Sequence, residues 1–165
     1  MDSVTREEGG WSVARTWLAA LEETARDFHG THPKAFCERG YEHATIRWYQ
    51  LLEEQFGITV PKAESMREAI QNHIALGVRI GLFRDASQFE LNQVNPYRVE
   101  VKALDCPYRF NCEQLLDAGF TIRDLTCARI GVFRSAAEIL SGIKCKYEVT
   151  GFHADKRCEG YVEHR

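Results

Sequence analysis

The sequence predicts an α+β fold in which N-terminal helices precede an antiparallel sheet of hairpins, with one long helix between the hairpins. Apolar residues recur every three to four positions in the first half of the chain and every second position in two later stretches. Of the 165 residues, 44% are hydrophobic and 27% are charged, which is typical of an ordinary globular protein. The chain has no internal repeat, low-complexity tract or linker, so we expect one domain over residues 1–165.

Three helices are expected in the N-terminal half. The first covers residues 11–29, and the second covers residues 41–56 and ends at Gly57. Ser65 followed by Glu68 is typical of a capping box and predicts the start of the third helix. The apolar stripe of the first helix consists of Val13, Trp17, Leu18, Leu21, Ala25 and Phe28.

Alternation with a period of two predicts two β-hairpins. The first pairs residues 89–91 with residues 97–103 across a turn at Asn95-Pro96, and the second pairs residues 144–150 with residues 157–163. In both hairpins one face is apolar and the other is polar, so each is expected to bury one face against the helices.

Two helices are expected between the hairpins. A short helix starts at Cys112 and ends near Gly119. The longer helix begins at Thr121 or Asp124 and ends at Gly142, where a glycine is favoured after the last helical residue.

The sequence predicts a soluble cytoplasmic protein with no membrane partner. Its first residues, MDSVTREEGG, lack the apolar run of a signal peptide, and no stretch approaches the ~18 apolar residues of a membrane span. Thiols stay reduced in the cytoplasm, so a disulfide set is not expected. The net charge is −3 and basic residues are scattered among acidic ones, which argues against bulk nucleic-acid binding.

Cysteines are the feature that points most directly to chemistry. Five of the six lie in the last third of the chain, at positions 106, 112, 127, 145 and 158. No CxxC pair occurs, so the spacing of a zinc ribbon or a dithiol oxidoreductase is missing. A metal or iron–sulfur site and thiols that merely pack therefore remain as alternatives to a disulfide set.

Four of these cysteines are expected to converge, because each lies at the end of a predicted element. Cys106 ends a strand, Cys112 opens a helix, Cys127 lies early in the long helix, and Cys158 begins the last strand. A buried group of thiolates needs a cation, which iron or zinc supplies, and helix N-termini favour the thiolate over the thiol. Cys106, Cys112, Cys127 and Cys158 are thus the candidate cofactor and metal ligands.

The remaining cysteines are weaker candidates. Cys145 shares a strand face with Tyr147 and Val149, so we expect it to pack in the core and hold it only in reserve as a ligand. Cys37 is expected in a loop near His32 and is a minor candidate.

Other side chains have an ordinary structural interpretation beside a functional one. His73 lies one helical turn from Ile70, so a hydrogen-bonded core histidine is favoured over a ligand. Arg109 and Arg129 flank cysteines, but a solvated surface arginine is the commoner case. Five aromatic residues fit either a simple core or an apolar pocket between helices and sheet: Trp11, Trp17, Trp48, Tyr49 and Phe83.

The C-terminal half resembles the V4R (4-vinyl reductase) family of small-molecule-binding domains, and is similar to the neighbouring L-2-amino-thiazoline-4-carboxylic acid hydrolase-like family. The resemblance lies in GLFRDASQFE, CPYRFNC, CARIG with its long helix, and the terminal YEV and CEGYVE, over roughly residues 70–163. It implies an α+β domain related to trafficking-complex subunits, with a pocket between helices and sheet and, commonly, a homodimer.

The same resemblance implies a metal site. Some V4R sensory domains hold zinc through cysteines and a glutamate, which would be Cys127, Glu148 and Cys158 here. The further cysteine expected after the glutamate is missing, since Gly151 occupies that stretch, and His153 is the candidate to replace it. The surplus of Cys106 and Cys112 instead favours a [4Fe–4S] cluster on the four candidate cysteines, with zinc as the alternative.

Three functions follow from these observations. We favour a sensory or regulatory domain that binds an iron–sulfur cluster and responds to redox state, a diatomic gas or a small ligand. The second is a sensor of small apolar molecules with structural zinc. The third is a hydrolase of cyclic thioimidates with Cys127 or Cys158 as nucleophile, which ranks last because no histidine is evidently paired with either thiol.

Overall fold

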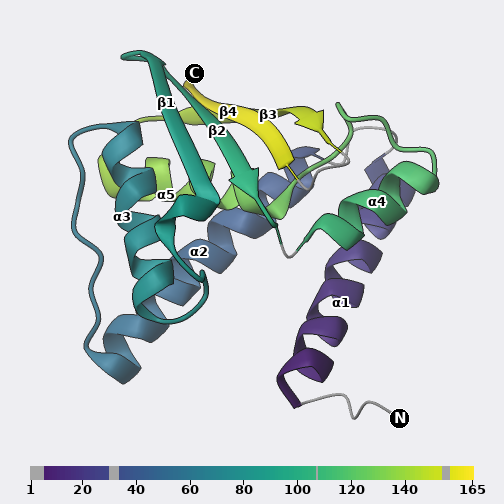
Figure 1. Ribbon diagram of the computed structural model, residues 1–165, viewed down its shortest axis with the longest axis horizontal. Helices are drawn as coiled ribbons and strands as arrows, with labels where there is room; N and C mark the ends of the chain where they lie inside the picture. Colours follow the sequence, from purple (N-terminus) through teal and green to yellow (C-terminus); the bar gives the residue numbers. More distant parts are fainter. Residues whose placement is uncertain (1–5, 30–33, 107, 154–156) are drawn as a thin grey trace.

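A four-stranded antiparallel sheet lies over a group of helices in the computed structural model (Figure 1), which describes residues 6–29, 34–106, 108–153 and 157–165. The sheet has the strand order β1-β2-β4-β3. The elements are α1 (Arg6–His29), α2 (Lys34–Phe56), α3 (Met66–Arg79), a 3-10 turn (Ala86–Gln88), β1 (Phe89–Asn95), β2 (Arg98–Leu104), α4 (Arg109–Asp117), α5 (Ala128–Ser141), β3 (Cys145–Phe152) and β4 (Arg157–His164). The predicted α+β class is confirmed.

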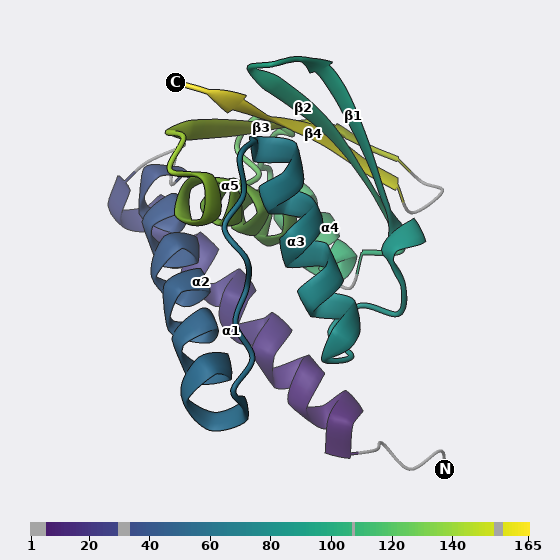
Figure 2. The same cartoon turned by 90° about the vertical axis from the view of Figure 1, so that its left-hand side faces the viewer.

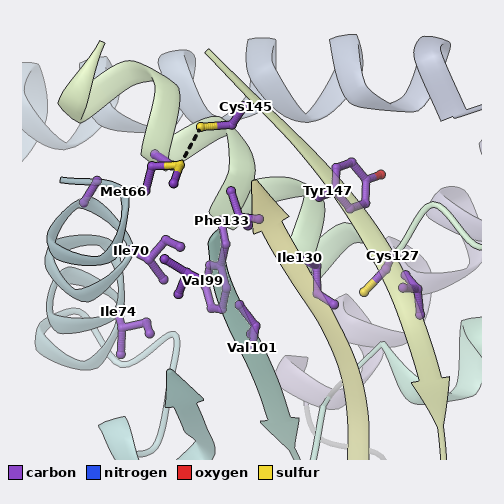
Figure 3. Packing of buried hydrophobic residues seen from close by; sticks show 14 of the residues in the cluster. Met66, Ile70, Ile74, Val99, Val101, Cys127, Ile130, Phe133, Cys145 and Tyr147 are labelled. Carbon is purple, nitrogen blue, oxygen red and sulfur yellow. Dashed lines mark hydrogen bonds between the residues drawn. The ribbon is translucent and has the colours of Figure 1, made fainter. Parts of the chain in front are cut away.

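Helix α5 packs against β3 and β4 of the sheet, and α2 and α3 pack against α5 (Figure 2). Its sheet-facing side chains Ile130 and Phe133 are fully buried, together with Val99 and Val101 of β2 (Figure 3). At Gly160 of β4, an added Cβ would lie 2.2 Å from a backbone oxygen of β3 and 2.5 Å from the Ile130 side chain. A side chain at this position would therefore push α5 away from the sheet.

The start of α3 agrees with the prediction. Ser65 is its N-cap, and the Ser65 hydroxyl accepts a hydrogen bond from the backbone N–H of Glu68 at 3.1 Å. The Glu68 carboxylate accepts a hydrogen bond from the backbone N–H of Glu64 at 2.8 Å. The two side chains thus satisfy backbone donors at the helix start, although Glu68 reaches one residue further back than in the usual capping box.

Both predicted hairpins are present. β1 pairs with β2 and β3 pairs with β4, all antiparallel, and β2 joins the two hairpins by pairing with β4. Tyr97, which was expected to begin the second strand, instead lies in the turn with 64% of its surface exposed. Its backbone N–H donates to the Asn95 side-chain oxygen, which closes the turn before β2 begins.

Four predicted helix starts are wrong, and three of these errors move a cysteine. α1 begins at Arg6 and not at residue 11. α2 begins at Lys34, so Cys37 is a buried residue of its first turn and does not lie in a loop. α4 begins at Arg109, so Cys112 lies inside the helix and does not open it. α5 begins at Ala128, so Cys127 is its N-cap and has a left-handed backbone with φ 44°.

The late start of α5 has a local cause. The Asp124 carboxylate accepts hydrogen bonds from both the backbone N–H and the hydroxyl of Thr121, at 2.9 and 2.7 Å. Such side-chain bonds compete with helical hydrogen bonds, so the segment forms a turn before the helix.

Cys145 is a packing residue, as expected. Its side chain is fully buried, and the thiol donates to the Ile143 carbonyl oxygen at 3.0 Å and contacts the Met66 sulfur at 3.3 Å (Figure 3). It lies in the core cluster with Met66.

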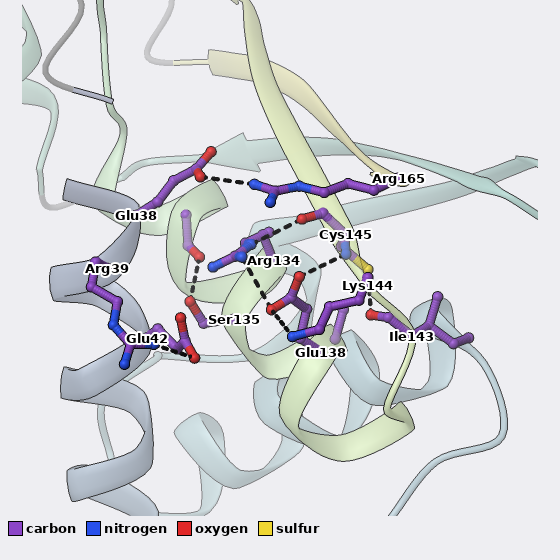
Figure 4. Close-up of polar contacts among 12 residues, drawn as sticks. Glu38, Arg39, Glu42, Arg134, Ser135, Glu138, Ile143, Lys144, Cys145 and Arg165 are labelled. Carbon is purple, nitrogen blue, oxygen red and sulfur yellow. Dashed lines mark hydrogen bonds and ion pairs between the residues drawn. The ribbon is translucent and has the colours of Figure 1, made fainter. Parts of the chain in front are cut away.

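A buried ion pair joins α5 to the start of β3 (Figure 4). Arg134 and Glu138 lie one helical turn apart with their charged groups at 3.0 Å, and their side chains are 6% and 7% exposed. The Glu138 carboxylate accepts a hydrogen bond from the Cys145 N–H at 2.7 Å, and Arg134 donates to the Cys145 carbonyl oxygen at 3.1 Å. The pair therefore forms hydrogen bonds with both the N–H and the carbonyl oxygen of Cys145, the first residue of β3.

The apolar stripe of α1 points away from the rest of the protein. Four of its members are between 51% and 81% exposed: Val13, Trp17, Leu21 and Phe28. The side of α1 that faces the protein buries Ala19, Ala25 and the carboxylate of Glu22. The stripe therefore predicts the helix correctly, although most of its side chains lie outside the core.

Candidate ligand-binding site

A cavity of about 200 Å³ lies between α2, α3 and α5. It combines aliphatic and aromatic side chains with a few polar groups, which is typical of small-molecule sites. Its lining consists of Ala44, Thr45, Trp48, His73, Leu82, Tyr108, Ala128, Arg129 and Val132.

His73 brings a neutral imidazole to this cavity. The side chain is 1% exposed, and its Nδ1 lies 2.7 Å from the Tyr49 hydroxyl, which confirms the expected hydrogen-bonded histidine. Its Nε2 is buried and has no hydrogen-bond partner among the described residues. Burial, and secondly the nearby Arg129 charge, lower the pKa of His73 to about 3. The ring is therefore uncharged at neutral pH and offers one unused nitrogen.

Arg129 is the second buried polar group, and it contradicts the expectation of a solvated arginine. Its side chain is 4% exposed. The guanidinium carbon lies 4.4 Å from the ring centroid of Phe83, 5.3 Å from that of Tyr108 and 5.5 Å from that of Phe89. These ring faces attract the charge but provide no hydrogen-bond acceptor of ordinary strength. The Nε and Nη2 atoms of Arg129 are buried, and no hydrogen-bond partner for them occurs in the part of the chain that the structure describes.

A second cavity, of about 230 Å³, lies next to the first, and Arg129 lines both. Trp11 and Phe83 line the second cavity, and Trp48 lines the first. The expected aromatic pocket is thus divided into two, and Trp17, at 66% exposure, is not part of either.

The four candidate cysteines lie within electrostatic range of one another. The pKa of the Cys112 thiol is raised first by burial and then by the charges of Cys127, Cys158 and Cys106. The pKa of Cys127 is also raised, first by burial, then by the charge of Cys106 and less strongly by that of Cys158. Burial, with Cys106 second, raises the pKa of Cys158 to about 12. We call these four residues the thiol cluster.

The thiol cluster is not arranged as a metal site. In the part of the chain that the structure describes, no three His, Cys, Asp or Glu side chains are placed to hold a metal ion. All six cysteines are free thiols. Assignment of the cluster as a cofactor site therefore stays a prediction.

The residues of the alternative zinc set have other partners. Glu148 is 44% exposed and forms an ion pair with Lys34 at 3.4 Å. His153 lies 3.6 Å from the Glu159 carboxylate. Neither forms a metal-binding group with Cys127 and Cys158 among the described residues.

The pKa of the Cys127 thiol is subject to two opposing effects. The backbone N–H groups of Arg129 and Ile130, at the start of α5, lower the pKa of Cys127, in the direction expected at a helix N-terminus. Burial has the larger effect and raises the pKa overall. A thiol nucleophile requires a lowered pKa or an adjacent base, so the raised pKa of Cys127 disfavours it as the nucleophile of a hydrolase.

The comparisons with known proteins establish the fold. No family model and no curated protein sequence matches the chain. The phenol-responsive sensory domain of the transcription activator PoxR, in a structure with phenol, is similar with a TM-score of 0.59 and 16% identity over 91% of this chain and 74% of that chain. A trafficking protein particle complex subunit 3 from Naegleria fowleri, covalently bound to palmitic acid, gives a TM-score of 0.53 and 11% identity over 97% of both chains.

An H-NOX protein mutant from K. algicida gives a TM-score of 0.48 at 11% identity over 88% of this chain and 70% of that chain. The chain therefore has the α+β fold found in the PoxR sensory domain and in a trafficking-complex subunit, as the resemblance implied. The V4R assignment itself stays a prediction. None of the helices in the described ranges has the length and apolarity needed to span a membrane.

Proposed function

We propose that this protein is a sensory domain that binds a small, largely apolar molecule in the cavity between α2, α3 and α5. The observation that carries this proposal is a cavity of about 200 Å³ whose walls bring together two buried polar side chains, His73 and Arg129, with unused hydrogen-bonding atoms. Buried polar groups without partners are costly in an empty site, and a bound ligand would remove that cost.

The size of the cavity supports a ligand of about one ring. An engineered cavity of ~150 Å³ in another protein binds benzene, so a site of about 200 Å³ can hold a ring with one substituent. Trp48 lies beside His73 with the two ring centroids 5.4 Å apart, which provides an aromatic wall. The fold shared with the phenol-responsive domain of PoxR is further support.

Ligand binding should raise the thermal unfolding midpoint. We expect at least one of four probes (phenol, toluene, benzamide or sodium benzoate) to stabilise the protein in differential scanning fluorimetry. The Val132→Phe variant, which fills part of the cavity, should lose this response while keeping a cooperative transition. The matched control is Val94→Phe, on the β1–β2 hairpin and 50% exposed, which should respond like the wild type. No response of the wild-type protein to any probe would refute the proposal.

The thiol cluster supports a second candidate function. We propose that Cys106, Cys112, Cys127 and Cys158 hold a metal centre, a [4Fe–4S] cluster or a zinc ion, that adds a redox or gas response to the domain. The support is that Cys106 contributes to the raised pKa of each of the other three thiols, although the four residues come from separate segments. Side-chain rearrangement would be required, because the described arrangement is not that of a metal site.

Metal content tests this second function directly. Protein purified without oxygen should contain iron and sulfide, or about one zinc per chain, and Cys112→Ser should reduce that content severalfold. Cys145→Ser is the matched control, since its thiol packs against Met66, and it should keep the metal. Wild-type protein that contains neither iron nor zinc would rule the metal centre out without affecting the ligand-binding proposal.

A further inference from the structure

The Arg129 guanidinium is a buried charge without a counter-ion. In the described ranges no carboxylate forms an ion pair with it, and two of its nitrogen atoms are buried without hydrogen bonds. The other buried arginine of α5, Arg134, is by contrast paired with Glu138 at 3.0 Å. A charge removed from water is normally paired or hydrogen-bonded, because isolated burial is very costly. Glu7 and Asp105 line the second cavity together with Arg129, but the Nε and Nη2 edge of Arg129 binds no acidic group of the described residues, so an anion is the partner that this edge lacks.

The two unused atoms of Arg129 define the shape of that anion. Nε and Nη2 lie on the same edge of the planar guanidinium, and their two N–H bonds are nearly parallel. This is the edge that binds both oxygens of a carboxylate in a bidentate pair. The aromatic rings of Phe83, Phe89 and Tyr108 surround the guanidinium and restrict its orientation.

His73 adds a second requirement. His73 and Arg129 line the same cavity, so one small molecule in it could contact both side chains. Because the imidazole is neutral, it adds no second positive charge and leaves one atom, Nε2, for a single hydrogen bond to a ligand.

We infer that the ligand of this cavity is a small aromatic or similarly planar carboxylate, held by its carboxylate group on Nε and Nη2 of Arg129, with its ring between Trp48 and Val132. This inference rests on the proposed ligand-binding function and specifies its ligand class. The cavity volume of about 200 Å³ accommodates one ring and one carboxylate.

Matched probes separate this inference from the general proposal. Isothermal titration calorimetry at neutral pH and fixed ionic strength should show benzoate binding at least tenfold more tightly than benzamide, which has the same shape without the charge. Equal or tighter binding of benzamide, phenol or toluene would overturn the carboxylate assignment and leave the sensory-domain proposal standing. Failure of every probe to bind would overturn both.

Variants of Arg129 test the contact itself. Arg129→Met keeps much of the side-chain volume and removes the charge, so it should lower benzoate affinity by about tenfold to a hundredfold and leave toluene binding unchanged. The matched control is Arg98→Met, since Arg98 also lies over a ring, that of Tyr161 at 3.7 Å, but does not line the cavity. Unchanged benzoate affinity in Arg129→Met would refute the inference. If that variant does not fold, the comparison of benzoate with benzamide on the wild-type protein still tests whether the ligand is a carboxylate.

Discussion

Acidification from pH 6.5 to pH 4 should remove about 3 kcal/mol of unfolding free energy through His73 alone. The pKa of His73 is lowered to about 3 in the folded protein, whereas an exposed histidine has a value of 6.5. Between these two values the unfolded chain binds a proton that the folded chain does not. The contribution is therefore complete above pH 6.5 and is lost as the pH falls towards 3. Urea unfolding at a series of pH values measures it.

Other groups titrate in the same range, so the comparison must be made between variants. The pKa of Glu22 is raised by burial, and its effect has the opposite sign, because a raised pKa stabilises the folded state as the pH falls. We expect His73→Gln to lose most of the difference between pH 6.5 and pH 4, and the exposed-site control His43→Gln to keep it. Identical pH profiles for His73→Gln and wild type would show that His73 does not carry the effect.

Replacing Glu138 by glutamine should destabilise the protein by about 3 kcal/mol. The variant keeps an acceptor for the Cys145 N–H but leaves the Arg134 charge, which is 6% exposed, without its partner at 3.0 Å. Breaking a buried pair from one side leaves an uncompensated charge, and this is where most of the cost arises. Chemical denaturation at neutral pH gives the free energy.

Two further variants isolate the pair. The double variant Arg134→Met with Glu138→Gln removes both charges and should be more stable than Glu138→Gln alone. Lys144 also lies near Glu138, at 3.7 Å, but is 75% exposed, so Lys144→Met should stay within about 0.5 kcal/mol of wild type. A loss of similar size in Lys144→Met would mean that the surface lysine, and not Arg134, is the effective partner.

Periodicity was a good guide to the type of each element and a poor guide to its start. The hairpins, the Ser65 cap and the glycine at the end of α5 follow from local signals, since turn residues and caps act within a few positions. The start of α5 was misplaced because Asp124 bonds Thr121 in a turn, and both a turn and a helix start use such residues. The single domain and the homodimer stay predictions.

The candidate site was harder to find from sequence because its two polar residues depend on burial. His73 was expected to make a hydrogen bond, which it does, but sequence cannot show that the second nitrogen is left over. Arg129 is interpreted from the sequence as a surface residue because most arginines are solvated. A signal was present: Arg129 falls within the apolar stripe of α5, at helical spacing from Val132, Phe133 and Ala136, and a charged residue in a stripe that faces the core is buried.

The attachment of α1 has a consequence for local opening of the structure. Most of its apolar stripe faces outward, so this helix is held by hydrogen bonds, from Tyr41 to Glu22, from Asn111 to the Arg15 carbonyl oxygen and from Arg26 to the Ala118 carbonyl oxygen, and by limited apolar packing of Leu18, Ala25 and Trp11. Detachment of α1 would expose less apolar surface to water than detachment of α5, whose side chains are almost all buried. The free energy of this local opening is therefore comparatively low, which places α1 among the less strongly protected parts of the molecule.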